Sequence, residues 1–116
     1  METQFRLVLD KDLARQLAEI PILNGEFVPA EEIPGKPLRL GLAEATAIVT
    51  FLASTAGLAK TITEIAERIM EWMRKQKQQH AKILIEGPRN DAVIEIDEKW
   101  DSAQLAEKIH LTVTED

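Results

Sequence analysis

Hydrophobic and polar residues alternate at the start of the chain. Every second residue from Phe5 to Leu9 is apolar, and a period of two predicts a β-strand with one buried face. Asp10 follows as a candidate helix N-cap, because its carboxylate can accept hydrogen bonds from backbone N–H groups that a first helical turn leaves free. The short helix that it would start has its apolar side at Leu13, Leu17 and Ile20.

Turn-forming residues dominate the next segment. Pro21 ends the short helix, Asn24-Gly25 indicates a turn, and Glu26-Phe27-Val28 predicts a short second strand. Residues 29–37 hold three prolines and a glycine, which favours an irregular surface connection.

A helical period then dominates a proline-free stretch over residues 40–79. In its second half, apolar residues recur at steps of three and four, and charged residues fill the other side. Glu64 with Arg68 and Glu71 with Lys75 are spaced as i,i+4 ion pairs. The apolar stripe of this half consists of Leu58, Ile62, Ile65, Ile69, Trp72 and Met73.

The first half of this stretch is small or apolar on nearly every side of a helix. Because its apolar phase runs through both halves without a slip, the pattern predicts one continuous helix over 40–79, with Gly57 as the place for a kink or break. A helix of some 38 residues within this stretch would extend about 57 Å at 1.5 Å per residue. That exceeds the expected diameter of the domain, so we expect part of the helix to pack on another chain.

The end of the chain predicts a hairpin and a final helix within residues 82–110. Ile83-Leu84-Ile85 and Val93-Ile94-Glu95-Ile96 flank a five-residue loop, Gly87 to Asp91. Asp101 and Gln104 have the spacing of a capping box for a helix with Leu105, Ala106 and Ile109 facing inward. The tail from Thr112 is expected to fray.

These elements predict an α+β (α/β) fold in the order β-α-(β)-α(long)-β-β-α. A small sheet with a C-terminal hairpin would pack against one long central helix and two short helices. At 116 residues the chain is expected to form a single domain, 1–116. Residues 1–38 would form the strand–helix unit and its connection, 40–79 the long helix, and 82–110 the hairpin and last helix.

Composition narrows the function classes. An apolar fraction of 45% with 29% charged residues is typical of a globular protein. Cysteine is absent, which excludes a thiol nucleophile and a Cys-based metal site. A net charge of −6 argues against a nucleic-acid partner, because phosphate binding needs a surplus of Lys and Arg. The N-terminus has no secretory pattern, and a cytoplasmic location is expected.

No catalytic or cofactor-binding pattern emerges from the candidate residues. Ser54 and Ser102 do not lie in a strand-to-helix elbow, and His80 and His110 lack a partner at the spacing of a metal-ligand pair. The acidic pairs Glu31-Glu32 and Asp97-Glu98 are typical of solvated loops. The glycines are dispersed and form no phosphate loop. We therefore expect no enzyme, no cofactor and no metal.

Two surface features have alternative interpretations. The basic cluster Arg74, Lys75, Lys77, His80 and Lys82 favours stabilisation of a helix C-terminus over binding to nucleic acid or anionic lipid. The apolar segment 42–59 is an alternative membrane anchor or pore element. Its uninterrupted run, 45–59, falls short of the roughly 20 apolar residues that a spanning helix needs.

A family resemblance follows from the order of these features. The long helix ends in Glu71-Trp72-Met73-Arg74-Lys75, and then come a strand, a turn and a strand, Lys82 to Pro88 and Ala92 to Asp97. This succession, best matched from Ala43 to Ile109, resembles the effector-associated constant component family, small standalone proteins of bacterial NTP-dependent conflict systems. Asn90-Asp91 stands where members of that family tend to carry a Gly-containing turn.

The resemblance implies a non-catalytic adaptor or scaffold that couples an effector, such as a protease, to an NTPase-type regulator. It supplies no catalytic residue. Together with the over-length helix, it leads us to expect a protein partner and a homo-oligomer, with contacts made mainly by the first half of the helix. The candidate interaction residues are Ile48, Phe51, Leu52, Thr55, Leu58, Trp72, Arg74 and Lys75.

Overall fold

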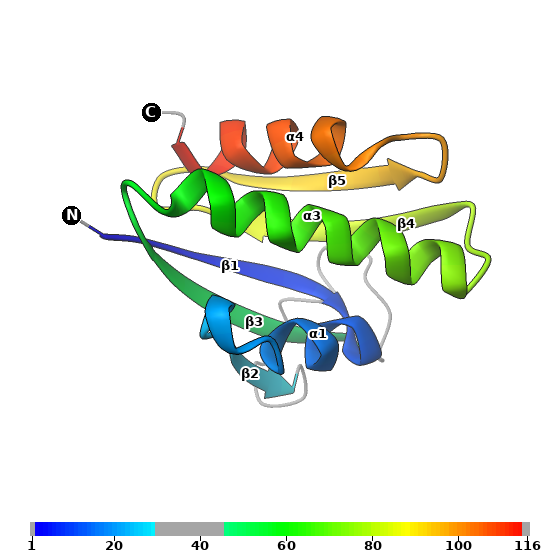
Figure 1. The fold of residues 1–116 in the computed structure, drawn as a ribbon, viewed down its shortest axis with the longest axis horizontal. Helices are drawn as coiled ribbons and strands as arrows, with labels where there is room; N and C mark the ends of the chain where they lie inside the picture. Colours follow the sequence, from blue (N-terminus) through cyan, green and yellow to red (C-terminus); the bar gives the residue numbers. More distant parts are fainter. Residues whose placement is uncertain (1, 30–45, 115–116) are drawn as a thin grey trace.

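The fold is a five-stranded antiparallel sheet with helices on one face (Figure 1). The computed structural model describes residues 2–29 and 46–114. The strand order is β2-β3-β1-β4-β5, so β1 and β3 lie inside the sheet. The predicted α+β class is confirmed. The predicted connection over 29–37 lies, from residue 30 on, outside the described residues, as do Glu31 and Glu32.

The described helices and strands follow the sequence in this order: β1 (Glu2–Asp10), α1 (Lys11–Ala18), a 3-10 turn η1 (Pro21–Leu23), β2 (Glu26–Pro29), β3 (Thr46–Ser54), α3 (Leu58–Lys75), β4 (His80–Glu86), β5 (Asp91–Asp97) and α4 (Ser102–Thr114).

The N-terminal strand and helix form as predicted. Phe5, Leu7 and Leu9 are all buried on one face of β1. The Asp10 carboxylate accepts hydrogen bonds from the backbone N–H groups of Asp12 and Leu13, at 2.9 and 3.4 Å. Asp10 is therefore the N-cap of α1, and the first turn of the helix begins where the strand ends.

The prediction of one continuous helix over 40–79 is wrong. Residues 46–54 form β3, which pairs with β1 along its full length, from Glu2 opposite Ser54 to Asp10 opposite Thr46. The principal dimensions of the structure are 34 × 32 × 27 Å, so no helix among the described residues is as long as the predicted one. The expectation that an over-length helix must pack on another chain falls with it.

Residues 46–54 form a strand for a physical reason that their apparent helical periodicity does not show. Ala47, Val49, Phe51 and Ala53 alternate along β3 and are buried under the helices. On the opposite face, Ile48 and Leu52 are also apolar, and their spacing of four residues imitates a helical repeat. The β-branched residues of the segment favour the pleated strand, in which their side chains are less crowded.

The second half of the predicted helix is α3, an amphipathic helix of 18 residues. It begins after Gly57, the position at which the sequence allowed a break. Its ion pairs also form on the exposed side, with Arg68 Nε 3.6 Å from Glu64 Oε1 and Lys75 Nζ 3.1 Å from Glu71 Oε1. All members of its predicted stripe are buried: Leu58, Ile62, Ile65, Ile69, Trp72 and Met73.

The hairpin and the last helix are confirmed, with small changes at their ends. β4 and β5 pair from His80 opposite Asp97 to Glu86 opposite Asp91, so the connecting loop is residues 87–90. The capping box forms: Asp101 N–H donates to Gln104 Oε1 at 3.0 Å and Gln104 N–H donates to Asp101 Oδ1 at 2.8 Å. α4 continues to Thr114, beyond the residue at which fraying was expected.

The two faces of the sheet differ. One main hydrophobic core lies between the sheet and α1, α3 and α4. The opposite face carries a small buried cluster at its centre, made by Val8, Ile48 and Leu84 from three adjacent strands. Around this cluster the face is mostly polar, with exposed Leu52 and Val93. We call it the far face.

Candidate functional site

A groove beside the first half of β1 is the main candidate site. The pairing of β4 with β1 stops at Arg6 opposite Glu86, and the hairpin loop then turns away. Residues 2–5 of β1 pair with β3 on one side and with no strand of the described residues on the other. The groove that lies along this edge has a volume of about 590 Å³. We call residues 2–5 the free edge of β1.

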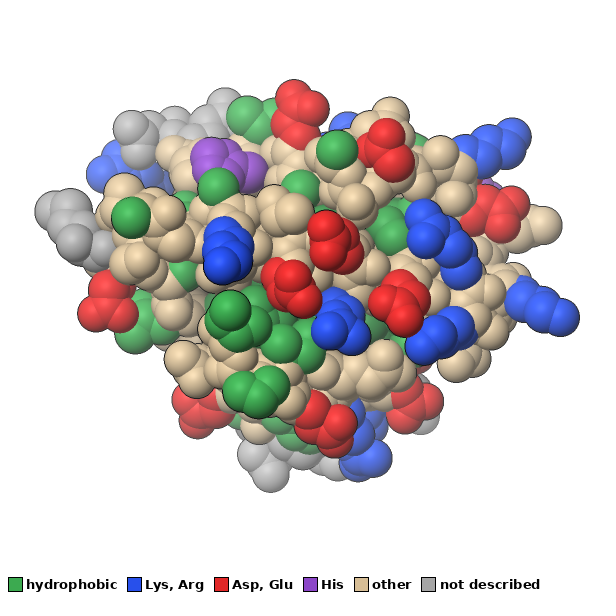
Figure 2. Space-filling model, viewed as in Figure 1, with side chains coloured by type: hydrophobic (Ala, Val, Ile, Leu, Met, Phe, Trp, Pro, Cys, Tyr) green, Lys and Arg blue, Asp and Glu red, His purple; other side chains and the backbone are tan. Residues whose placement is uncertain are grey.

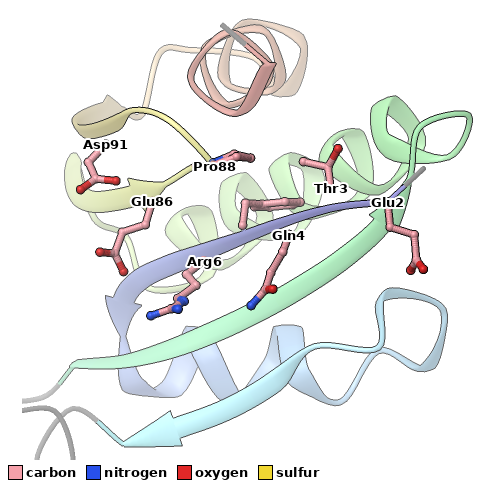
Figure 3. A pocket seen from close by; sticks show the side chains of 9 residues that line it. Glu2, Thr3, Gln4, Arg6, Glu86, Pro88 and Asp91 are labelled. Carbon is pink, nitrogen blue, oxygen red and sulfur yellow. The ribbon is translucent and has the colours of Figure 1, made fainter. Parts of the chain in front are cut away.

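Strand alternation divides the groove between two sides (Figure 3). Glu2, Gln4 and Arg6 point to the far face, whereas Thr3 points the other way. The remaining lining comes from the end of β4, the loop that follows it and the first residue of β5: Glu86, Gly87, Pro88 and Asp91. The site is therefore built by two segments that are distant in sequence.

The walls of the groove are held by packing. Phe5, the last residue of the free edge, stacks on Phe51 of β3 with ring centroids 5.4 Å apart. On the opposite wall, a Cβ added at Gly87 would lie 2.9 Å from the backbone oxygen of Thr112 and 3.2 Å from Cα of Val113. The hairpin loop is thus seated directly on the end of α4, and only glycine fits there without a shift.

Charges on the far-face side of the groove are mainly negative. Its lining contains the carboxylates of Glu2, Glu86 and Asp91 and the guanidinium of Arg6. Arg6 stands opposite Glu86 on β4, and Glu86 stands opposite Asp91 on β5, so the three form a row across the sheet. Glu86 is only 9% exposed. An arrangement of this kind attracts a cation or a basic side chain.

A second groove of about 510 Å³ lies between α3 and α4. Its lining is mixed, with Ile62, Glu67 and His110 among small residues of both helices. Figure 2 shows acidic and basic side chains interspersed over this side of the molecule. No backbone edge is open there, so this groove offers a partner less than the free edge of β1 does.

The predicted interaction residues do not form one surface. Phe51 and Leu58 lie in the main core, and Ile48 belongs to the buried cluster of the far face. Leu52, which is 54% exposed, lies opposite Gln4 on the far face. Thr55 is exposed in the turn before α3.

The other predicted interaction residues lie at the C-terminal end of α3. Arg74 and Lys75 are exposed there, about 25 Å from Leu58 along the helix. Trp72 is 5% exposed and belongs to the core. Its indole Nε1 is buried and has no hydrogen-bond partner within residues 2–29 and 46–114.

One titratable group near that end has a shifted pKa. A hydrogen bond with Lys75, together with the charge of that ammonium group, lowers the pKa of the Glu71 carboxyl from its ordinary value. The pair lies on the solvent-facing side of α3. It stabilises the end of the helix and creates no reactive group.

The residues considered for catalysis are scattered, and three of them have structural partners. Ser54 Oγ accepts a hydrogen bond from Gly57 N–H at 3.0 Å, and Asp97 Oδ1 accepts one from Lys99 N–H at 2.9 Å. His110 lies 3.4 Å from the Thr114 hydroxyl. Across residues 2–29 and 46–114, no group of three or more His, Asp or Glu side chains is arranged to hold a metal ion.

Half of the segment considered for membrane insertion, 42–59, is strand. Residues 46–54 are β3, flanked on both sides by β1 and β2. Within the described parts of the chain, no helix has both the length and the apolar character needed to cross a bilayer.

Sequence reasoning missed the groove. The signal that was present is the alternation of Glu2, Gln4 and Arg6 with Phe5 and Leu7, which places the polar residues on one face. The place at which β4 stops pairing with β1 depends on the register between distant segments. That register cannot be inferred from a local sequence pattern.

Comparison with known protein families, with curated proteins and with solved structures finds no match for this chain.

Proposed function

We propose that this chain is a non-catalytic adaptor of a bacterial conflict system, which couples an effector such as a protease to its regulator through protein–protein contacts. A cytoplasmic location belongs to the same proposal. The defence role rests on the resemblance of α3, its Trp72-containing end and the following hairpin to the effector-associated constant component family. The binding role rests on the geometry of the free edge.

The single observation that carries the binding role is the free edge of β1 beside the groove. Backbone N–H and C=O groups on the unpaired side of a strand can form a ladder with an added extended segment, as in many peptide-binding domains. The groove of about 590 Å³ supplies the space next to residues 2–5. The adaptor would therefore bind its partner by strand addition.

The outer edges of the sheet lack this opportunity. β2 has only four residues and ends at Pro29, and β5 presents Asp91, Glu95 and Asp97 along its exposed side. Short length, proline and charge are the devices by which proteins protect sheet edges from added strands. The free edge of β1, in contrast, pairs with β3 on one side and faces the groove on the other. The groove can therefore position an added strand.

A partner of different sequence fits the structure better than a second copy. The reason for expecting a homo-oligomer was the over-length helix, and residues 46–54 are a strand instead. The proposed partner is an effector or a regulator that supplies an extended segment. Light scattering should then detect a one-to-one complex with that protein.

The test is co-purification of the tagged chain with the products of the genes that flank its own, followed by titration of each product at tens of micromolar. Proline variants at Thr3 and Gln4 locate the contact. Because consecutive residues of a strand direct their N–H groups to opposite sides, one variant removes a donor from the free edge and the other removes one from the ladder with β3.

The variant that keeps the parent's thermal unfolding should lose the partner, because its proline faces the groove. The other variant should lose stability and serves as the control for general damage. If no flanking product binds, the adaptor function is wrong. If a product binds the stable proline variant as tightly as the parent, binding does not occur by strand addition at this edge.

A further inference from the structure

We infer that the groove selects an extended partner segment with a basic side chain on the far-face side and small apolar side chains toward the helices. This inference rests on the proposed function and specifies the chemistry of the partner at the same site. It comes from the different lining of the two sides of the free edge.

An added strand would take the position that β4 leaves beyond Glu86. Four residues opposite Glu2–Phe5 extend about 13 Å at 3.3 Å per residue. Because paired residues in a sheet point to the same face, every second side chain of the segment would project beside Gln4 and its neighbours on the far face. The others would project beside Thr3 and Phe5 on the helix side.

The far-face side of the groove calls for positive charge. Glu2 lies at one end of the free edge, and Glu86 and Asp91 lie at the other end across the loop. The lining thus holds three acidic side chains against one basic side chain, Arg6. A lysine or arginine of the segment would reach these acids without being buried, because Glu2 and Asp91 are exposed.

The helix side calls for small side chains. Phe5 is buried and closely stacked on Phe51. Opposite it, Gly87 and Pro88 form a wall that is fixed by the contact of Gly87 with Thr112 and Val113. A large side chain would have to displace that backbone contact, whereas alanine, serine or valine would not.

The same charges disfavour a second copy of this chain as the occupant. Its own free edge would bring another Glu2 to a groove that already contains three carboxylates. The whole chain also has a net charge of −6. Like charges at an interface select against the wrong partner, so the segment comes from a different protein.

The experiment uses three fluorescein-labelled peptides of eight residues, in which valine and alanine alternate with lysine, glutamine or glutamate. Fluorescence anisotropy measures their dissociation constants for the intact chain. The lysine peptide should bind about tenfold more tightly than the glutamate peptide, with the glutamine peptide between them. Higher salt should reduce this difference, since charges near a surface are screened.

Glu2→Lys tests the site, and Glu98→Lys is its matched control. Both variants change the net charge equally, but Glu98 lies in the turn after β5 and outside the groove. Glu2→Lys should abolish the preference for the lysine peptide, and Glu98→Lys should retain it. Amide hydrogen exchange should show new protection at residues 2–5 when the lysine peptide is bound.

Three results overturn the inference: equal affinities for the peptides, no binding of the lysine peptide, or equal effects of the two variants. These failures are distinct from failure of the adaptor function. A flanking protein that binds through the free edge, but with the same affinity for Glu2→Lys as for the parent, would retain the adaptor and remove its preference for basic segments.

Discussion

Residues 46–54 and 58–75 adjoin one another, share an apolar character, and fold into different structures. The first segment is β3, an inner strand of the sheet, and the second is α3, a helix on the core face of that sheet. Only three residues separate them. In α3 one apolar stripe faces the core and the other side is charged, whereas β3 has apolar residues on both faces.

The difference shows when the spacing of apolar residues can distinguish a helix from a strand. The charged side of α3 excludes a strand, because a period of two would bury Glu64, Arg68 and their neighbours together with the core residues. β3 contains no charged residue, so nothing in its polarity excludes either structure. A segment that is apolar on both faces satisfies a helical and a strand period together, and its β-branched content then has to decide.

Phe51→Ala should cause the largest loss of stability in this comparison. Phe51 is fully buried and stacked on Phe5, so its truncation should cost about 3–5 kcal/mol. Leu52→Ala, one residue further on, should cost less than about 0.5 kcal/mol because Leu52 is 54% exposed. Urea denaturation of the two variants measures both values.

The stability losses at these two neighbouring positions distinguish a strand from a helix over residues 46–54. On the predicted helix, Leu52 belonged to the apolar stripe that runs on through α3, and its truncation would be costly. A large loss at Leu52 with a small loss at Phe51 would therefore contradict β3.

Most of the fold was predictable from local signals. The caps at Asp10 and Asp101, the stripe of α3 and the alternation of Ile94 and Ile96 in β5 each depend on residues close together in sequence. Propensity and hydrogen bonding act over that range. The prediction for residues 46–54 failed because their local pattern is compatible with both a helix and a strand. Pairing with β1 and β2 decides between the two.

The candidate site was less predictable than the fold. Half of the predicted interaction residues are buried: Ile48 and Phe51 lie in the segment that forms a strand instead of a helix, and Leu58 and Trp72 belong to the buried stripe of α3. The groove depends on where β4 leaves β1 and on the seating of Gly87 against α4. Both are contacts between segments far apart in sequence.

Ile69→Ala tests the α3 side of the comparison. Ile69 is fully buried in the middle of the stripe, so the variant should lose about 2–4 kcal/mol. Glu67→Ala, on the exposed side of the same helix, should change the unfolding free energy by less than about 0.5 kcal/mol. Similar losses for the two variants would mean that the assigned helical face is wrong.

Ser54→Ala examines the junction between the two segments. Gly57 N–H donates to Ser54 Oγ and to the Ser54 carbonyl, each at 3.0 Å. Because the site is exposed, loss of the hydroxyl should cost about 0.5 kcal/mol. Amide exchange at Gly57 should quicken while exchange in the middle of α3 stays unchanged. Unchanged exchange at Gly57 would show that the hydroxyl has no part in ending the strand.

Glu71→Gln should have the smallest effect, because the pair with Lys75 is exposed to solvent. In the folded chain the hydrogen bond with Lys75 lowers the pKa of Glu71. A group whose pKa is lowered on folding contributes stability above its unfolded-state pKa and loses it as the pH falls through the folded value. Parent and variant should therefore differ slightly at neutral pH and converge in acid, and an NMR titration should place the Glu71 pKa below its ordinary value.

β3 has no charged residue to compare, so a stability that depends on pH through this pair belongs to the α3 side alone. Substitutions at Thr50 should leave the pH dependence unchanged, and a change there would show that the two segments are coupled through more than their shared core.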